Sequence, residues 1–140
     1  MRKIVVTTLA ALAVSISSLW SQCSPENYTA ACVPKLTGFN FLKSYKIDGE
    51  AGAKAKVEYS YVFTKGTQYM IQVCAEGTAT DGIVVSLYDA SRNQVASSKI
   101  DNQLLAGIAY PCNATGIYYI QYTFDKSAKY CGGSALGFKR

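Results

Sequence analysis

Short runs in which apolar and polar side chains alternate are the feature that most constrains the fold of this 140-residue chain. In "VEYSYVF" (57–63) every second residue is apolar or aromatic, and "QYMIQVC" (68–74) and "IYYIQYTF" (117–124) repeat the pattern. Period-two alternation is typical of half-buried strands. The turn-forming stretches "TKGT", "ASRN" and "NATG" separate the runs. We therefore expect an all-β fold, an antiparallel and jelly-roll-like β-sandwich of about seven to eight strands.

Strand parity assigns an inner and an outer face to the clearest runs. The residues expected to point into the core are Ile83, Val85 and Leu87 in one run and Tyr118, Ile120, Tyr122 and Phe124 in another. Tyr88 and Tyr119 then point outward, on strands that could be neighbours. Tyrosines on an outer sheet face can stack on sugar rings or dock a protein. Tyr88 and Tyr119 are therefore the candidate ligand-binding residues, although ordinary surface packing would also account for them.

The first residues have the layout of a secretory signal peptide. Arg2 and Lys3 precede the apolar stretch "IVVTTLAALAV", which ends in the small and polar "SISSLWSQ". We expect cleavage after Ser21, so that 1–21 is removed and 22–140 forms a single domain. The apolar stretch is too short to span a bilayer comfortably, and the mature chain contains no transmembrane segment. The protein is thus expected in the periplasm, on the cell surface or in the medium, and lipidation of Cys23 is the alternative.

All of the cysteines remain in the mature chain, and their number is odd: Cys23, Cys32, Cys74, Cys112 and Cys131. An exported protein meets an oxidising compartment, so disulfides are expected, but the sequence does not choose among the pairings. We expect Cys112, at the end of a strand, to link that strand to a neighbour. The unpaired cysteine leaves a covalent homodimer open. The stretch "CSPENYTAACVPKLTG" is expected to be an irregular arm held by a bridge, and no run predicts a convincing amphipathic helix.

Composition excludes several classes of function. Because Arg2 and Lys3 leave with the signal peptide, the formal charge falls from +5 to +3. The remaining cations are scattered, so no nucleic-acid partner is expected. The absence of histidine excludes a Ser–His–Asp triad, a Cys–His pair and a histidine metal site, and neither a metal nor a cofactor is expected. A pair of carboxylates for glycoside hydrolysis stays open, although most acidic residues fall in loops.

Three pieces of the chain, taken together, resemble a known family. "YVFTKGTQYMIQV", "DGIVVSLYDASRNQVASS" and "ATGIYYIQYTF" contain Gly66, the triplet 87–89 (Leu-Tyr-Asp) and the stretch 116–119 (Gly-Ile-Tyr-Tyr). Over about 57–124 this order resembles the pre-peptidase C-terminal (PPC) domain of secreted bacterial proteins. The resemblance implies a jelly-roll-like sandwich that accompanies exported enzymes and sometimes binds polymers such as collagen or glycans.

The chain also departs from that family. Family members are usually appended to an enzyme, the cysteines are not part of the pattern, and no family binding residue maps clearly onto this chain. From the residues we expect an exported, non-catalytic binding module for a glycan or an extracellular protein. The alternatives are a structural or adhesion component of the cell surface and a small secreted hydrolase.

Overall fold

The computed structural model describes residues 23–76 and 80–140. Its helical elements are α1 (Pro25–Cys32) and two short 3-10 turns, Val33–Lys35 and Glu50–Gly52. The strands are β1 (Asn40–Asp48), β2 (Lys56–Phe63), β3 (Gln68–Cys74), β4 (Ile83–Tyr88), β5 (Gln94–Ser97), β6 (Lys99–Ile100), β7 (Gln103–Leu104), β8 (Gly107–Pro111), β9 (Gly116–Phe124) and β10 (Cys131–Lys139).

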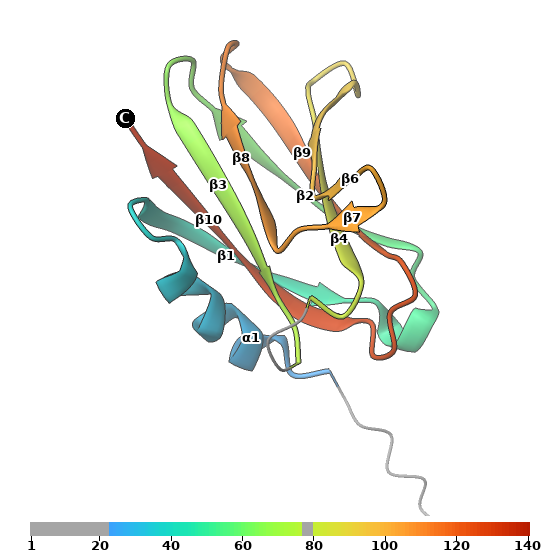
Figure 1. The fold of residues 1–140 in the computed structure, drawn as a ribbon. Helices are drawn as coiled ribbons and strands as arrows, with labels where there is room; N and C mark the ends of the chain where they lie inside the picture. Colours follow the sequence, from blue (N-terminus) through green and yellow to red (C-terminus); the bar gives the residue numbers. More distant parts are fainter. Residues whose placement is uncertain (1–22, 77–79) are drawn as a thin grey trace, which may run out of the picture.

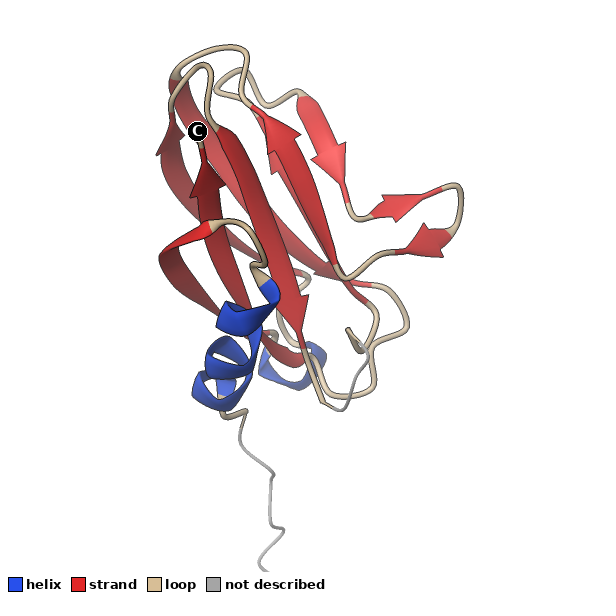
Figure 2. Cartoon of the chain, turned by 60° about the vertical axis from the view of Figure 1, so that its left-hand side comes forward, coloured by secondary structure: helices blue, strands red, loops and turns tan. Residues whose placement is uncertain are grey.

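Eight of these strands form two four-stranded sheets that pack face to face (Figures 1 and 2). The first sheet has the order β1-β10-β3-β8 and the second has the order β2-β9-β4-β5. Every strand pair is antiparallel. Within this set the chain crosses to the other sheet after each strand except β4, which is the wrapping of a jelly roll. The predicted all-β, antiparallel, jelly-roll-like sandwich is therefore confirmed.

The core lies between the two sheets and follows the predicted strand parity. Tyr118, Ile120 and Tyr122 of β9 are buried, as are the inward residues of β4. Phe124 is only half-buried and packs against the edge of this core. Alternation is visible on β9 because one face meets the core and the other meets solvent, and the polar residues Gln121 and Thr123 lie on the solvent face.

The described residues hold ten strands, more than the seven to eight expected. Two of them, β6 and β7, form a separate two-stranded hairpin (Figure 1). This hairpin lies in the connection between β5 and β8, and the sequence shows no alternation across such short strands. Strand β10 was not predicted either. Its residues are buried on both faces from Cys131 to Gly137, so no polar face marks it as a strand.

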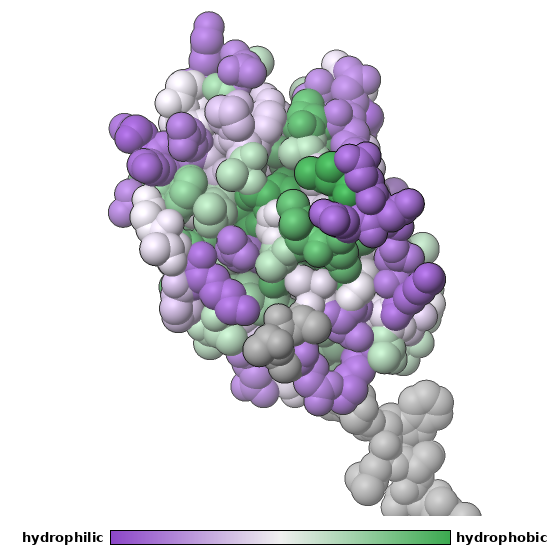
Figure 3. Space-filling view, viewed as in Figure 1, coloured by the Kyte–Doolittle hydropathy of each residue, from purple (hydrophilic) through white to green (hydrophobic). Residues whose placement is uncertain are grey.

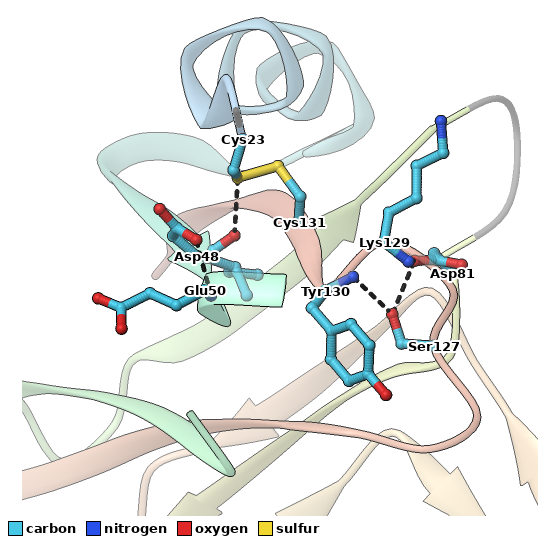
Figure 4. Close-up of a disulfide and its surroundings, with 9 residues drawn as sticks. Cys23, Asp48, Glu50, Asp81, Ser127, Lys129, Tyr130 and Cys131 are labelled. Atoms are coloured by element: carbon cyan, nitrogen blue, oxygen red, sulfur yellow. Dashed lines mark hydrogen bonds between the residues drawn. A yellow bond between two sulfur atoms is a disulfide. The ribbon is translucent and has the colours of Figure 1, made fainter. Parts of the chain in front are cut away.

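The segment that follows Cys23 contains helix α1, so the expectation of an irregular arm was wrong. The helix packs on the outer face of the first sheet, against β10, β1 and β3 (Figure 2). Only Pro25 and Cys32 of α1 are buried. Disulfides fix the helix near both ends: Cys23 to Cys131, shown in Figure 4, and Cys32 to Cys74. The apolar surface of α1 is narrow, so the two disulfides provide much of its attachment to the first sheet.

The predicted signal peptide, 1–21, lies outside the described residues, and the cleavage site after Ser21 stays a prediction. Among the residues that the structure describes, no helix is long and apolar enough to cross a bilayer.

Candidate functional site

Tyr88 and Tyr119 lie side by side on the outer face of the second sheet. Tyr88 is the last residue of β4, and its register partner on β9 is Tyr119. Both side chains are half-buried, and the Tyr88 hydroxyl lies 3.5 Å from the amide oxygen of Gln94. Their outward direction agrees with the sequence analysis, which had left open whether their strands are neighbours. Whether the pair binds a ligand stays a prediction.

Arg92 covers the ring of Tyr119, and sequence reasoning missed it. Its guanidinium carbon lies 3.7 Å from the centre of the Tyr119 ring, which is a cation–π arrangement. The same guanidinium group forms an ion pair with Glu58 on β2. Arg92 thus reaches from the β4–β5 turn across β9 to β2. The sequence did predict that Glu58 points outward. However, the spacing of residues along the chain cannot show that Arg92, in a turn, extends across two strands to contact it.

The conformation of the β4–β5 turn places Arg92 there. One carboxylate oxygen of Asp89 accepts hydrogen bonds from the backbone N–H groups of Ser91 (3.0 Å) and Asn93 (2.9 Å). The N–H of Arg92 donates to the carbonyl of Asp89 at 3.0 Å, and Arg92 itself has φ +66°. An aspartate that accepts from the residues after it is typical of a tight turn. The "DASRN" stretch is therefore a hairpin turn that orients one cation over the sheet.

An apolar area adjoins the tyrosine pair toward the free edge of the sheet. Val62 of β2 and Ile117 of β9 are register partners, and their exposed fractions are 58% and 48%. Ser60, Tyr61, Val62 and Ile117 line an open hollow on this part of the surface. We call the area formed by Val62, Ile117, Tyr119, Tyr88 and Arg92 the outer-face patch.

The buried tyrosines of the core, Tyr118, Tyr122 and Tyr45, are uncharged at physiological pH. Burial raises the pKa of the Tyr118 hydroxyl above its ordinary value, with further contributions from Tyr110 and Cys112. Burial likewise raises the pKa of Tyr122, and it raises the pKa of Tyr45 to about 12. These hydroxyls therefore stay protonated, so the patch carries only the charges of its own exposed residues.

Cys112 is the free cysteine of the described residues, so the expectation that it links two strands was wrong. Only 3% of its surface is exposed. Its sulfur lies 3.2 Å from the carbonyl oxygen of Ala114 and 3.6 Å from the hydroxyl of Tyr118. A buried thiol cannot reach a second chain, and the other four cysteines pair within the chain. The covalent homodimer through an odd cysteine is therefore not supported.

The acidic residues are mostly engaged in ion pairs on the surface. Glu26 pairs with Lys46 at 2.6 Å and Asp125 with Lys99 at 2.6 Å, while Glu76 pairs with Lys129. Within 23–76 and 80–140, no three residues among His, Cys, Asp and Glu gather closely enough to hold a metal ion. The outer-face patch consists of tyrosine, arginine and aliphatic side chains.

The fold and the site together define a small, disulfide-linked jelly-roll sandwich with an aromatic outer face. No protein-family model matches the chain, and no curated protein matches it in sequence. Among solved structures, it is similar to PliG of Aeromonas hydrophila, a periplasmic inhibitor of g-type lysozyme. The identity is 12%, the TM-score is 0.46, and the match covers 74% of this chain and 90% of that one. A similarity this distant carries no argument about function.

Proposed function

We propose that the protein is an exported, non-catalytic binding module that recognises an extracellular protein through the outer-face patch. The observation that carries this proposal is that Tyr88 and Tyr119 are register partners on the outer face and that Arg92 lies over the Tyr119 ring. Tyrosine and arginine are enriched in the parts of interfaces that contribute most binding energy. Val62 and Ile117 extend the same surface with exposed aliphatic groups that a partner could bury.

A protein fits this surface better than a glycan does. A sugar stacks on a free aromatic face, but Arg92 already occupies the outer face of the Tyr119 ring. A sugar ring would have to displace the guanidinium group and its ion pair with Glu58. A protein partner can instead contact Arg92, Val62 and Ile117 together. The glycan therefore ranks second.

Export is part of the proposal. Two disulfides in a chain of this size are typical of proteins that fold in an oxidising compartment. The predicted signal peptide, and the resemblance to domains that accompany exported enzymes, favour the same compartment. We infer a location in the periplasm, on the cell surface or in the medium.

The experiment is cross-linking of the exported, tagged protein in its native host, followed by mass spectrometry of the linked proteins. We expect one partner to be captured by the wild type and lost from a Tyr88→Ala, Tyr119→Ala double variant. Phe41→Ala is the matched control, because Phe41 is an exposed aromatic residue on β1 of the other sheet, with an exposed fraction of 48%. Equal capture by the double variant and the wild type would contradict the proposed surface.

A further inference from the structure

The sandwich has four edge strands, and three of them are modified in ways that hinder the addition of another strand. Strand β1 has a register shift between Phe41 and Lys43. Strand β5 is four residues long, and its pairing with β4 shifts between Leu87 and Tyr88. Strand β8 has five residues and ends at Pro111. Bulges, short strands and proline are the usual protections of an exposed edge.

Strand β2 is the exception among these four edges. It has eight residues without proline, and its register with β9 runs without a shift from Lys56 to Phe63. Its first half carries Lys56 and Glu58, and the Tyr59 hydroxyl donates a hydrogen bond to the carbonyl of Lys46 on β1. That half is charged and tied to the neighbouring edge. The second half, Ser60–Phe63, is uncharged.

Hollows flank this free half of β2 on both sides. The outer hollow is lined by Ser60, Tyr61, Val62 and Ile117. A second hollow is shared with the first sheet, and Tyr61, Val62, Leu42, Tyr69 and Phe138 are among its lining residues. Successive side chains of a strand point to opposite faces of its sheet. A strand added to β2 would therefore place alternate side chains in the two hollows.

The charges on this side of the molecule indicate which segment fits. Lys43 of β1, Lys56 of β2, Lys65 in the following turn and Arg140 beside the second hollow form no ion pair with a described residue. Glu58, the acidic residue of β2, is already paired with Arg92. Where the added segment extends beyond Ser60–Phe63, acidic side chains at its ends would meet Lys56 at the start of β2 and Lys65 after its end. Such complementarity orients a partner and excludes wrong ones.

We propose that the Ser60–Phe63 edge of β2 binds an extended segment of a protein partner as a fifth strand of the second sheet. The segment has apolar side chains that point alternately into the two hollows, and it has acidic residues at its ends. In this mode backbone hydrogen bonds provide affinity, and the pockets for alternate side chains provide specificity. The inference rests on the proposed function only in taking the partner to be a protein.

The test uses the oxidised full-length mature protein, labelled with ¹⁵N. The probe is a synthetic peptide with alternating valine and tyrosine residues in the middle and two glutamates at each end. We expect amide shift changes centred on 60–63 and slower hydrogen exchange there. The control peptide replaces the glutamates with lysines, and we expect it to bind at least tenfold more weakly. Shift changes centred on another face, or no binding by the glutamate peptide at millimolar concentration, would overturn the proposal.

Two matched variants locate the contact. Val62→Asp places a repelling carboxylate beside the added strand, so the peptide affinity should fall at least tenfold. Ile100→Asp makes the same change on the β6–β7 hairpin, where Ile100 has an exposed fraction of 54% and Figure 3 shows apolar surface. That variant should bind like the wild type. Equal losses in the two variants would overturn the assignment to β2.

The two proposals can fail separately. If cross-linking finds a partner that Tyr88→Ala and Tyr119→Ala abolish while Val62→Asp does not affect it, the tyrosine part of the outer-face patch stands and the edge proposal is wrong. If the peptide binds to 60–63 but the tyrosine variants capture every partner as well as the wild type does, the edge proposal stands and the proposed function of the patch is wrong.

Discussion

Arg92 and Tyr119 form a contact that joins three elements of the second sheet. The guanidinium carbon of Arg92 lies 3.7 Å from the centre of the Tyr119 ring, and the same group pairs with Glu58. The turn after β4, the central strand β9 and the edge strand β2 are thus connected on the outer face. A half-exposed ion pair alone contributes little to stability, but an arginine that also covers a ring excludes water from it.

This contact should be measurable as an energetic coupling. We expect Arg92→Ala and Tyr119→Leu each to lower the free energy of unfolding. In a double-mutant cycle their coupling should be about 0.5–1 kcal/mol. Glu58→Gln, which removes only the ion pair, should cost less than about 1 kcal/mol because the Arg92 side chain is half-exposed. Urea unfolding of the four proteins of the cycle gives the values, and additive effects of the two changes would show that the ring contact contributes nothing.

The two disulfides should differ in their resistance to reduction. Cys32 is fully buried and Cys74 nearly so, whereas Cys23 is half-buried before α1. Because exchange requires access of a thiolate to the sulfur, dithiothreitol should open the bridge from Cys23 to Cys131 first. Quenching with an alkylating reagent at increasing times, followed by peptide mass spectrometry, gives the order. Simultaneous labelling of all four cysteines would instead mean that the native protein unfolds before either bridge opens.

Cys112 should be the one thiol of the native protein and should not react until the fold opens. Its sulfur is enclosed by the carbonyl of Ala114 and the hydroxyl of Tyr118. A colorimetric thiol assay should find about none in native buffer and one per chain in denaturant, as expected for a buried structural cysteine. Non-reducing electrophoresis should show a monomer. A rapidly reacting native thiol would contradict the burial of Cys112.

The parts of the fold that could be predicted from the sequence are strands with one buried face and one solvent-exposed face. On β9, Ile120 and Tyr122 point inward while the polar Gln121 and Thr123 point outward, and this alternation marks the strand. Strand β10 could not be predicted in this way, because α1 covers one of its faces and the core covers the other. Its residues Gly132 and Gly133 also lack the side chains by which a strand is usually detected.

Contacts set by tertiary structure also escaped prediction. Helix α1 has a weak apolar pattern, and the disulfides of Cys23 and Cys32 attach it to the sheet. Parity predicted the outward direction of Tyr88 and Tyr119, but only the structure shows that their strands are neighbours. The position of Arg92 over Tyr119 depends on a left-handed backbone conformation in a turn, which the residue type does not reveal.

Stability should fall in acid through Asp81, which organises the loop before β10 (Figure 4). Partial burial alone would raise the pKa of this carboxyl, but hydrogen bonds from the Ser127 hydroxyl and the backbone N–H groups of Lys129 and Ala128 outweigh burial and hold the pKa below 3.8. A depressed folded-state pKa gives stability that is present above the unfolded value and is lost as pH falls through the folded value. The loss should therefore begin near pH 4 and deepen below it.

Asp81→Asn tests this dependence. Asparagine tolerates the left-handed conformation of this residue (φ +50°), so the backbone can persist. The amide cannot accept all of the hydrogen bonds, so the variant should be less stable at neutral pH by about 1–3 kcal/mol. The difference from the wild type should then shrink as the pH falls from 4 to 2. Thermal unfolding at several pH values gives both results, and a constant difference would show that Asp81 does not titrate as described.

Gly133 should be required for the docking of α1. A β-carbon at Gly133 would lie 2.4 Å from the backbone nitrogen of Thr29 in α1, and a backbone atom cannot move aside without shifting the helix. The disulfides at both ends of α1 restrict that shift, so Gly133→Ala should lower the free energy of unfolding by about 1–3 kcal/mol.

Gly116→Ala is the matched control, because a β-carbon there meets nothing within 4 Å. Chemical unfolding measures both variants, and hydrogen exchange should show faster exchange of α1 amides only in Gly133→Ala. Equal stability of the two variants would mean that α1 does not press on β10 at this position.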